Sequence, residues 1–425
     1  MKYIIYILLF LNISVINSLS AQNYNNPYKL ELYPFISDSA NHLTVFGDST
    51  GFDIVYKKLD SIILTGKGNL NIVHFGGSHI QAGIWPGRIR LRFQHLAPGM
   101  KGALGFVFPY RIAQINSPYY YWIEYTGEWE SCRNVEKDKI CDLGVGGISV
   151  TTTDTLSEII IHKRKWIDYP EYYFNRIKVI HDLNGSYDVD LNYPDSIKYH
   201  KTIDSLGGIS VFRLNKNLDT LKLIIKKNDS LQTHFTLYGI ILENDDPGIV
   251  YHSFGINGAS VPSYLRCNLF NKQLQLFSPD LAILSIGIND AYGNDFDTLM
   301  FEHNYDSLIT KIRSISPNCA IILTTNNDSY VYHRRLNRNG LLVRRAMFRI
   351  AERYNAGVWD MFSVMGGLNS IVVWQKLKLA KTDKIHFTQP GYILIGDLFF
   401  NAFLKSYDKY IDKKNNLLTK TVQAN

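Results

Sequence analysis

Strand-like segments fill the stretch from about Gly102 to Glu243, whereas strands alternate with helices on both sides of it. Asn, Asp, Gly and Ser turns separate the short β-branched segments of this stretch, which read GISVTTTD, SEIIIHKRK, NRIKVIHDL, ISVFRL, DTLKLIIKK and HFTLYGIILE. This spacing is typical of an antiparallel sandwich or barrel and not of βαβ units. The central stretch therefore predicts a β domain of its own.

The flanking stretches predict an α/β domain. Before the central stretch, the strand GNLNIVHF leads into the helix WPGRIRLRFQHL; after it come the strands DLAILSIG and AIILTTN and the helices YDSLITKIRSI and LLVRRAMFRIAERY. Pro390 opens a closing amphipathic helix, PGYILIGDLFFNAFLKSY. We therefore predict an α/β fold, a three-layer domain with a short, mainly parallel sheet, interrupted by an inserted antiparallel β-sandwich.

The predicted organisation divides the 425 residues into five parts. Residues 1–21 combine one lysine, an apolar stretch and small residues, which is typical of a cleavable export signal. Residues 22–101 and 246–411 form the two parts of the α/β domain, 102–245 the inserted domain, and 412–425 a polar, disordered tail. No later apolar run approaches the roughly 20 residues that a bilayer crossing needs. We therefore expect a periplasmic or secreted protein without stable membrane insertion once the signal is cleaved.

Charge and composition argue against several classes of partner. The formal charge of +7 is spread among acidic residues and forms no stripe, so nucleic-acid binding is not expected. The histidines are dispersed and no His-Glu-x-x-His occurs, so we expect no metal and no cofactor. Export would permit disulfides. Cys132 and Cys141 flank a short polar stretch and either bridge a hairpin or remain thiols, whereas Cys267 and Cys319 are expected to be buried small hydrophobes.

Two polar turns follow strands of the α/β parts. Ser78, in HFGGSHIQAG, comes after a strand and before a helix, so that its hydroxyl can project from the sheet edge and its N–H can face an oxyanion. In YHSFGINGAS two glycines surround Asn257, which predicts a loop able to present a second backbone N–H.

Two further motifs complete this set. In LSIGIND a strand ends at Gly287 and is followed by Asn289, whose amide can donate a third hydrogen bond. In TDKIHFTQPGY, Asp383 precedes His386 by three residues, so one carboxylate can orient one imidazole. Each motif alone is common, but their order and their places at strand ends favour nucleophilic hydrolysis.

In these motifs the sequence resembles the SGNH hydrolases, also called the GDSL family. The resemblance implies Ser78 as nucleophile, His386 as general base and Asp383 as its orienting partner. It implies an oxyanion hole made by Ser78, Gly258 and Asn289. The sequence departs from the family at Gly77, where the family has an aspartate that helps to hold the turn.

The chain also resembles the periplasmic peptidoglycan O-acetylesterases, in which a carbohydrate-binding-module-like β domain interrupts the SGNH domain. The similar segments are GSHIQAGIWPGRIRLRFQ, GALGFVFPYRIAQINSP and FTLYGIILENDDPGIVYHSFGINGAS. This resemblance implies removal of acetyl groups from an acetylated glycan through an acyl-enzyme. A carbohydrate O-acetyltransferase, an esterase for another acetylated polysaccharide and a non-catalytic glycan-binding protein stay open as alternatives, and the sequence predicts no oligomeric state.

Several other residues have two interpretations each. Tyr120, Trp122 and Trp129 either stack on sugar rings or belong to the core of the inserted domain. Trp374 either walls the cleft or packs between helices. The loop NNDSYVYHRRLNRNG either brings Asn327, Asp328 and Arg334 to the substrate or is solvated, and His79 is expected at the loop or substrate edge.

Overall fold

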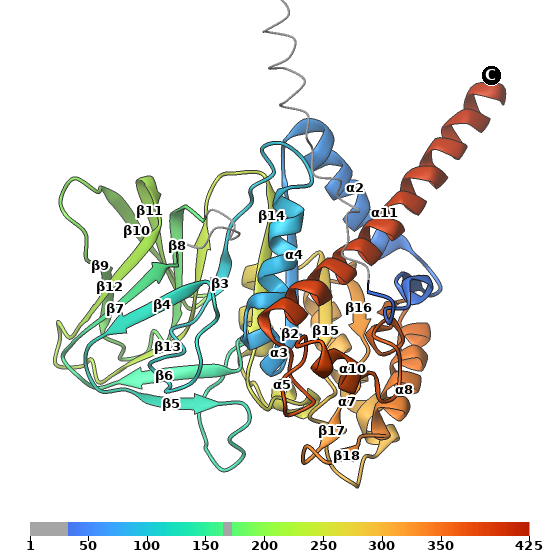
Figure 1. Ribbon diagram of the computed structural model, residues 1–425. Helices are drawn as coiled ribbons and strands as arrows, with labels where there is room; N and C mark the ends of the chain where they lie inside the picture. Colours follow the sequence, from blue (N-terminus) through green and yellow to red (C-terminus); the bar gives the residue numbers. More distant parts are fainter. Residues whose placement is uncertain (1–32, 165–171, 425) are drawn as a thin grey trace, which may run out of the picture.

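The computed structural model describes residues 33–164 and 172–424, so the predicted export signal lies outside the described residues. A six-stranded sheet forms the centre of the α/β domain, in the order β1-β19-β16-β15-β2-β14 (Figure 1). Its strands are β1 (Leu43–Val45), β2 (Asn69–Gly76), β14 (Gly248–Gly255), β15 (Leu281–Ser285), β16 (Ala320–Thr324) and β19 (Gly357–Trp359). All neighbours pair in parallel except β1, which joins the edge strand β19 in antiparallel register. The predicted short, mainly parallel sheet is therefore confirmed.

Helices cover both faces of this sheet. The long helices are α2 (Thr50–Thr65), α4 (Ile84–Gln94), α7 (Thr298–Ile315), α8 (Asn339–Arg353) and α11 (Gln389–Ala424). Because side chains alternate along a strand, Ile72 of β2 packs into a core shared with α2, α4 and α11, whereas Val73 packs into the opposite core, shared with α7 and α8. These two cores make the three-layer arrangement.

Short elements connect the layers around the sheet. They are η1 (Asp38–Ala40), α3 (Ser78–Gln81), α5 (Val261–Leu265), α6 (Phe270–Leu274), η2 (Gln275–Phe277), β17 (Tyr330–Val331), β18 (Arg335–Leu336), α9 (Met361–Val364) and α10 (Ser370–Lys376). None of the helices in the described part of the chain is both long enough and apolar enough to cross a membrane.

Strands β3 to β13 form the β insert, residues 105–243, which lies beside the α/β domain (Figure 1). They are β3 (Gly105–Val107), β4 (Tyr121–Tyr125), β5 (Glu130–Arg133), β6 (Ile148–Thr152), β7 (Leu156–Lys163), β8 (Phe174–His181), β9 (Asp188–Leu191), β10 (Tyr199–Asp204), β11 (Ile209–Leu218), β12 (Thr220–Lys226) and β13 (Phe235–Glu243). One antiparallel sheet has the order β10-β11-β8-β13-β6-β5, with β3 also on β13, and the second has the order β4-β7-β12-β9. The predicted antiparallel β-sandwich is confirmed.

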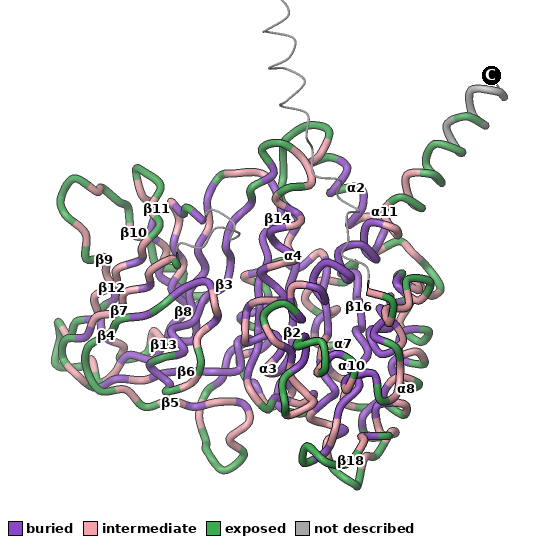
Figure 2. The backbone as a smooth tube through the Cα atoms, in the orientation of Figure 1, coloured by how far each residue is buried: buried purple, intermediate pink, exposed green. Residues whose placement is uncertain are grey.

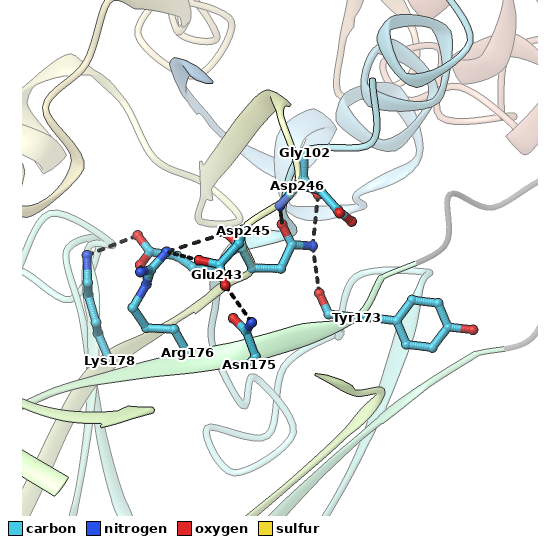
Figure 3. A network of polar contacts seen from close by, with 9 residues as sticks. Gly102, Tyr173, Asn175, Arg176, Lys178, Glu243, Asp245 and Asp246 are labelled. Atoms are coloured by element: carbon cyan, nitrogen blue, oxygen red, sulfur yellow. Dashed lines mark hydrogen bonds and ion pairs between the residues drawn. The ribbon is translucent and has the colours of Figure 1, made fainter. Parts of the chain in front are cut away.

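The chain enters and leaves the β insert at one place, which Figure 3 shows from close by. The side-chain amide of Asn244 donates to the carbonyl of Gly102 at 3.0 Å and to that of Tyr173 at 2.9 Å, and its Oδ1 accepts from the N–H of Asp246 at 3.1 Å. Gly102 has a φ of +66°, and a Cβ there would lie 2.1 Å from the carbonyl oxygen of Ile249. The two crossing segments are thus tied together without interrupting the parallel sheet.

Two sequence expectations outside the site have clear outcomes. Cys132 and Cys141 form a disulfide in the β insert, while Cys267 and Cys319 are free and buried. The disordered tail over 412–425 is corrected, because α11 continues to Ala424. Its extension contains no glycine or proline, and Lys414 pairs with Asp60 of α2 at 2.6 Å.

Candidate active site

The serine that follows β2 lies at the carboxyl edge of the parallel sheet, as the first residue of α3. Its Oγ lies 2.7 Å from Nε2 of His386, a residue 308 positions later in the chain. Nδ1 of His386 lies 2.9 Å from Oδ2 of Asp383. The structure therefore brings the three predicted side chains into one hydrogen-bonded row, in the order that nucleophilic catalysis requires.

The turn before α11 fixes the orientation of the imidazole. Oδ1 of Asp383 accepts from the backbone N–H groups of Ile385 and His386, each at 2.9 Å. Although partial burial opposes ionisation, hydrogen bonds from the backbone and the imidazole of His386 hold the pKa of Asp383 below its usual value. An ionised Asp383 accepts the Nδ1 proton, which leaves Nε2 as the acceptor for the Ser78 hydroxyl.

The predicted oxyanion loop is pinned to α3. Gly258 has a φ of +82°, which favours glycine. The N–H of Asn257 donates to Oε1 of Gln81 at 2.6 Å, and Nε2 of Gln81 donates to the carbonyl of Asn116 at 2.8 Å. Sequence reasoning missed Gln81, although its place three residues after Ser78 puts it one helical turn further on.

Asn289 lies between the serine turn and the oxyanion loop. Its Nδ2 donates to the carbonyl of Ala259 at 2.9 Å, which leaves one N–H of the amide for another acceptor. A Cβ on Gly77 would lie 3.0 Å from this same nitrogen. The absence of a side chain at Gly77 thus allows the amide to approach the backbone just before Ser78.

Two other residues to which sequence reasoning assigned no role fix the elements beside the site. The hydroxyl of Tyr264 donates to the carbonyls of Gly76 and Phe254, both at 2.8 Å, and so joins the carboxyl ends of β2 and β14. The carboxylate of Asp290 accepts from the N–H of Val261 at 3.1 Å. Burial raises the pKa of Asp290 to about 6. Asp290 is adjacent to Asn289 in the motif, but only the fold reveals that it anchors α5.

The β insert reaches the same loop, which no sequence signal indicated. Among the described residues, Cγ1 of Val135 is the nearest heavy atom to the position of a Cβ on Gly258, at 3.9 Å. Arg266 fixes the segment that carries Val135, because its guanidinium donates to the carbonyls of Asn134 and Glu136 at 2.9 and 2.8 Å. The disulfide between Cys132 and Cys141 closes this segment into a loop.

The loop after β16 is corrected from solvated to buried in its first part. Asn327 and Asp328 are 3% and 1% exposed, whereas Arg334 is exposed. The amide of Asn327 donates to the carbonyl of Ile385 at 3.0 Å, so it supports the turn that carries the histidine. The carboxylate of Asp328 accepts from the N–H of Ile371 at 3.1 Å.

His79 is buried within α3 and does not lie in a loop. Its Nδ1 lies 2.8 Å from the hydroxyl of Tyr392, and its ring centroid is 5.2 Å from that of His386. Burial lowers the pKa of His79 to about 3, so this imidazole stays neutral next to the predicted base.

The aromatic residues divide between the two interpretations. Tyr120 and Trp374 are buried, and the indole N–H of Trp374 donates to the carbonyl of Met365 at 3.1 Å. Trp129 is half-buried and donates to the carbonyl of Thr126. Trp122 is 36% exposed and stacks on His162 with a centroid distance of 3.9 Å. Among these four, Trp122 is the most exposed.

No three His, Cys, Asp or Glu side chains gather as a metal-binding group within the part of the chain that the structure covers.

Comparisons with known proteins agree with this architecture. Residues 236–394 match the model of the GDSL-like Lipase/Acylhydrolase family, a region that includes Gly258, Asn289 and His386 but not Ser78. A solved structure of a peptidoglycan O-acetylesterase in action superposes with a TM-score of 0.71 at 20% identity, covering 86% of this chain and 99% of that one. No curated protein matches the sequence. The shared fold extends over the α/β domain and the insert together, which the sequence had predicted.

Smaller structures match only part of the chain. A lipase/acylhydrolase from Enterococcus faecalis has a TM-score of 0.29 and 21% identity, covering 36% of this chain and 74% of its own. An acetyl xylan esterase, AlAXEase, has a TM-score of 0.30 and 18% identity, covering 37% and 82%.

Proposed function

We propose, on the premise that this chain is an ester-hydrolysing enzyme of the GDSL-like acylhydrolase type, that it removes O-acetyl groups from a carbohydrate polymer and that this polymer is peptidoglycan. The observation that carries the proposal is the hydrogen-bonded row of Ser78, His386 and Asp383, with bonds of 2.7 and 2.9 Å. The architecture shared with a peptidoglycan O-acetylesterase supports the choice of polymer.

The reaction begins with the serine. Oγ of Ser78 attacks the acetyl carbonyl carbon while Nε2 of His386 takes the hydroxyl proton, and Asp383 stabilises the imidazolium that forms. The N–H groups of Ser78 and Gly258 and the amide of Asn289 donate to the oxyanion. When the tetrahedral intermediate collapses, the sugar oxygen leaves with the proton from His386 and the acetyl group stays on Ser78.

Water completes the cycle. His386 takes a proton from a water molecule that attacks the acetyl-serine, a second tetrahedral intermediate collapses, and acetate leaves as Ser78 regains its proton. The side chain of His386 is 32% exposed, so water can reach the acyl-enzyme. This exposure favours hydrolysis over acetyl transfer to a sugar, which requires that water be kept out.

The location that we propose is periplasmic or secreted. The disulfide between Cys132 and Cys141 supports it, because disulfides form and persist in oxidising compartments.

Acetate release from O-acetylated peptidoglycan and from a small chromogenic acetate ester tests the proposal. We expect Ser78→Ala to lose several orders of magnitude in kcat and Ser230→Ala, at an exposed serine of the β insert, to behave like the parent protein. Product analysis with an added acceptor sugar separates hydrolysis from transfer. Normal turnover by the folded Ser78→Ala protein would eliminate the triad assignment, and acetylated acceptor without free acetate would make the protein a transferase.

A further inference from the structure

A polar cavity of about 210 Å³ lies between the β insert and α6, apart from the triad. None of the three triad residues lines it. Tyr238 of β13 and Asp182 come to it from the β insert, and Lys272 and Gln273 come to it from α6. Both parts of the molecule therefore build this cavity.

Two deeply buried side chains turn unused polar atoms toward the cavity. Tyr238 is 4% exposed, and its hydroxyl makes no hydrogen bond with any other residue in the described ranges. Gln273 is 3% exposed; its Oε1 accepts from the N–H of Val145 at 3.2 Å, but its Nε2 has no acceptor in these same ranges. Neither atom is among the fully buried polar atoms that lack a partner in the described ranges, so both are accessible from the cavity. A ligand with acceptor oxygens can therefore accept hydrogen bonds from both.

The cavity is lined by charged groups of both signs, one ammonium and two carboxylates. The ammonium of Lys272 forms no ion pair within the described chain, and its Nζ lies close to Gly208, 3.6 Å from the position that a Cβ there would take. Asp142 uses one oxygen to accept from the amide of Asn268 at 2.5 Å, and Asp182 pairs with His234 at 3.2 Å. Burial and the charges of Asp182 and Asp142 raise the pKa of Tyr238, so its hydroxyl remains a donor.

This arrangement selects against charged ligands. An anion would meet two carboxylates and a cation would meet the ammonium. A neutral molecule with many hydroxyl or amide groups can instead accept from Tyr238, Gln273 and Lys272 and donate to the free oxygen of Asp142. The cavity is smaller than the roughly 300 to 1,000 Å³ of sites for drug-sized ligands, which fits a single ring.

We propose that this cavity binds one N-acetylated or hydroxyl-rich sugar ring of a glycan chain. Its choice of ligand rests on the proposed function, and it adds a second glycan contact away from the triad. Asp142 directly follows Cys141, and the loop that this disulfide closes carries Val135 to Gly258. One short segment of the β insert thus extends from the cavity to the oxyanion loop, so a polymer held in the cavity stays near Ser78.

Calorimetric titration with the N-acetylglucosamine tetramer tests the proposal. The full chain with Ser78→Ala serves as the parent, and Tyr238→Phe in that background removes only the unpartnered hydroxyl. We expect Kd to rise by roughly three- to tenfold, as for the loss of one hydrogen bond, and Lys272→Ala to weaken binding as well. Tyr173→Phe, at an exposed tyrosine of the same insert, should leave Kd unchanged.

Turnover provides the second readout, with Ser78 restored. Tyr238→Phe should raise KM for the O-acetylated polymer and leave hydrolysis of the small acetate ester at the parent rate. No tetramer binding at millimolar concentration, or the same Kd in Tyr238→Phe and Lys272→Ala as in the parent, would overturn the proposal. Binding of inorganic phosphate that Lys272→Ala abolishes, without sugar binding, would make the cavity an anion site. These results are independent of whether Ser78→Ala abolishes hydrolysis, so the proposal for the cavity and the assignment of the triad can be refuted separately.

Discussion

Gly77, which directly precedes Ser78, leaves space for the side-chain amide of Asn289. A Cβ there would lie 3.0 Å from Nδ2 of Asn289, and the same nitrogen is held by the carbonyl of Ala259 at 2.9 Å. Real Cβ contacts are rarely so short, so a side chain at position 77 must displace the amide by a few tenths of an ångström. The absence of a side chain at position 77 therefore keeps the Asn289 amide close to the backbone of this turn.

The first prediction follows from this contact. Gly77→Ala should lower kcat for an acetate ester by roughly tenfold, with little change in KM, because an oxyanion donor that is displaced but not removed loses part of its effect. Asn289→Ala should lower kcat by about a hundredfold or more. Steady-state kinetics checks both, and Gly340→Ala, which meets only an ordinary contact in α8, is the control. A normal kcat in the Asn289→Ala protein would make this amide a structural turn residue.

The second prediction concerns pH and Asp290. Burial raises its pKa to about 6, against about 3.9 in an unfolded chain. Between these pH values Asp290 binds more protons in the folded state than in the unfolded chain. The contribution of Asp290 to the free energy of unfolding is therefore largest at low pH, decreases from about pH 4 to pH 6, and stays low above that. Asp290→Asn should remove this decrease, which amounts to about 1 to 3 kcal/mol.

Urea unfolding at pH 4.5 and pH 7.5 measures the effect. The asparagine retains an acceptor for the N–H of Val261, which the carboxylate holds at 3.1 Å. Asp138→Asn, at an exposed position of the disulfide loop, is the matched control for the loss of a carboxylate. Parallel pH curves for the parent and Asp290→Asn would show that this carboxyl is no less solvated in the folded protein than in the unfolded chain.

The residues that the sequence could predict are those whose chemistry is encoded locally. Asp383 and His386 are three residues apart, and Ser78 sits where a strand meets a helix, so their motifs are visible in the sequence. Gln81 and Val135 act through contacts with the loop around Gly258, more than 120 residues away. Neither carries a motif, because their function depends on which distant segments the fold brings together.

At the scale of elements, the third prediction concerns the junction in Figure 3. Asn244 is 5% exposed and joins both chain crossings through its bonds to Gly102, Tyr173 and Asp246. Asn244→Ala should lower the free energy of unfolding by about 2 to 4 kcal/mol, because it leaves the buried carbonyl of Gly102 and two partly buried backbone groups without partners. Thermal and urea unfolding measure this loss.

Asn175→Ala is the matched control at the same junction. Its amide donates to the exposed Asp245 at 2.8 Å, so its replacement should change stability by no more than about 0.5 kcal/mol. Equal losses in both variants would assign the effect to the whole polar network. No loss in Asn244→Ala would show that strand pairing alone holds the insert.

The types of element follow from the sequence more directly than their ends do. The strand-only texture of the β insert and the βα units around it correctly predict the two sheets. The end of α11 was predicted wrongly, since polar residues after Tyr410 suggest a tail. Asp60 of α2 accepts from Tyr407 at 3.1 Å and from Lys414 at 2.6 Å. Such contacts between distant segments extend a helix beyond what its local composition indicates.

At the scale of the whole molecule, the insert combines a contact with the site and a solvent-facing surface of its own. Its disulfide loop lies against Gly258, while its smaller sheet, β4-β7-β12-β9, carries Trp122, which is 36% exposed and stacked on His162. Figure 2 shows that the β insert combines a buried interior with many exposed segments away from the α/β domain. A small soluble ester needs only the triad and the oxyanion donors that we propose, whereas a polymer can also contact this surface.

The last prediction separates these two roles. Trp122→Ala removes an open aromatic face on which a sugar ring can stack, a contact worth about 0.5 to 1.5 kcal/mol, so activity on insoluble O-acetylated wall material should decrease by roughly two- to tenfold. Hydrolysis of a small acetate ester should stay at the parent rate, because Trp122 belongs to the sheet of the β insert that does not carry the disulfide loop. Leu231→Ala, at a non-aromatic position of the insert that is more exposed than Trp122, controls for loss of exposed apolar surface. Equal decreases on both substrates in a folded Trp122→Ala protein would show that this residue supports the catalytic site. Unchanged activity on both would show that the Trp122 ring does not bind the polymer.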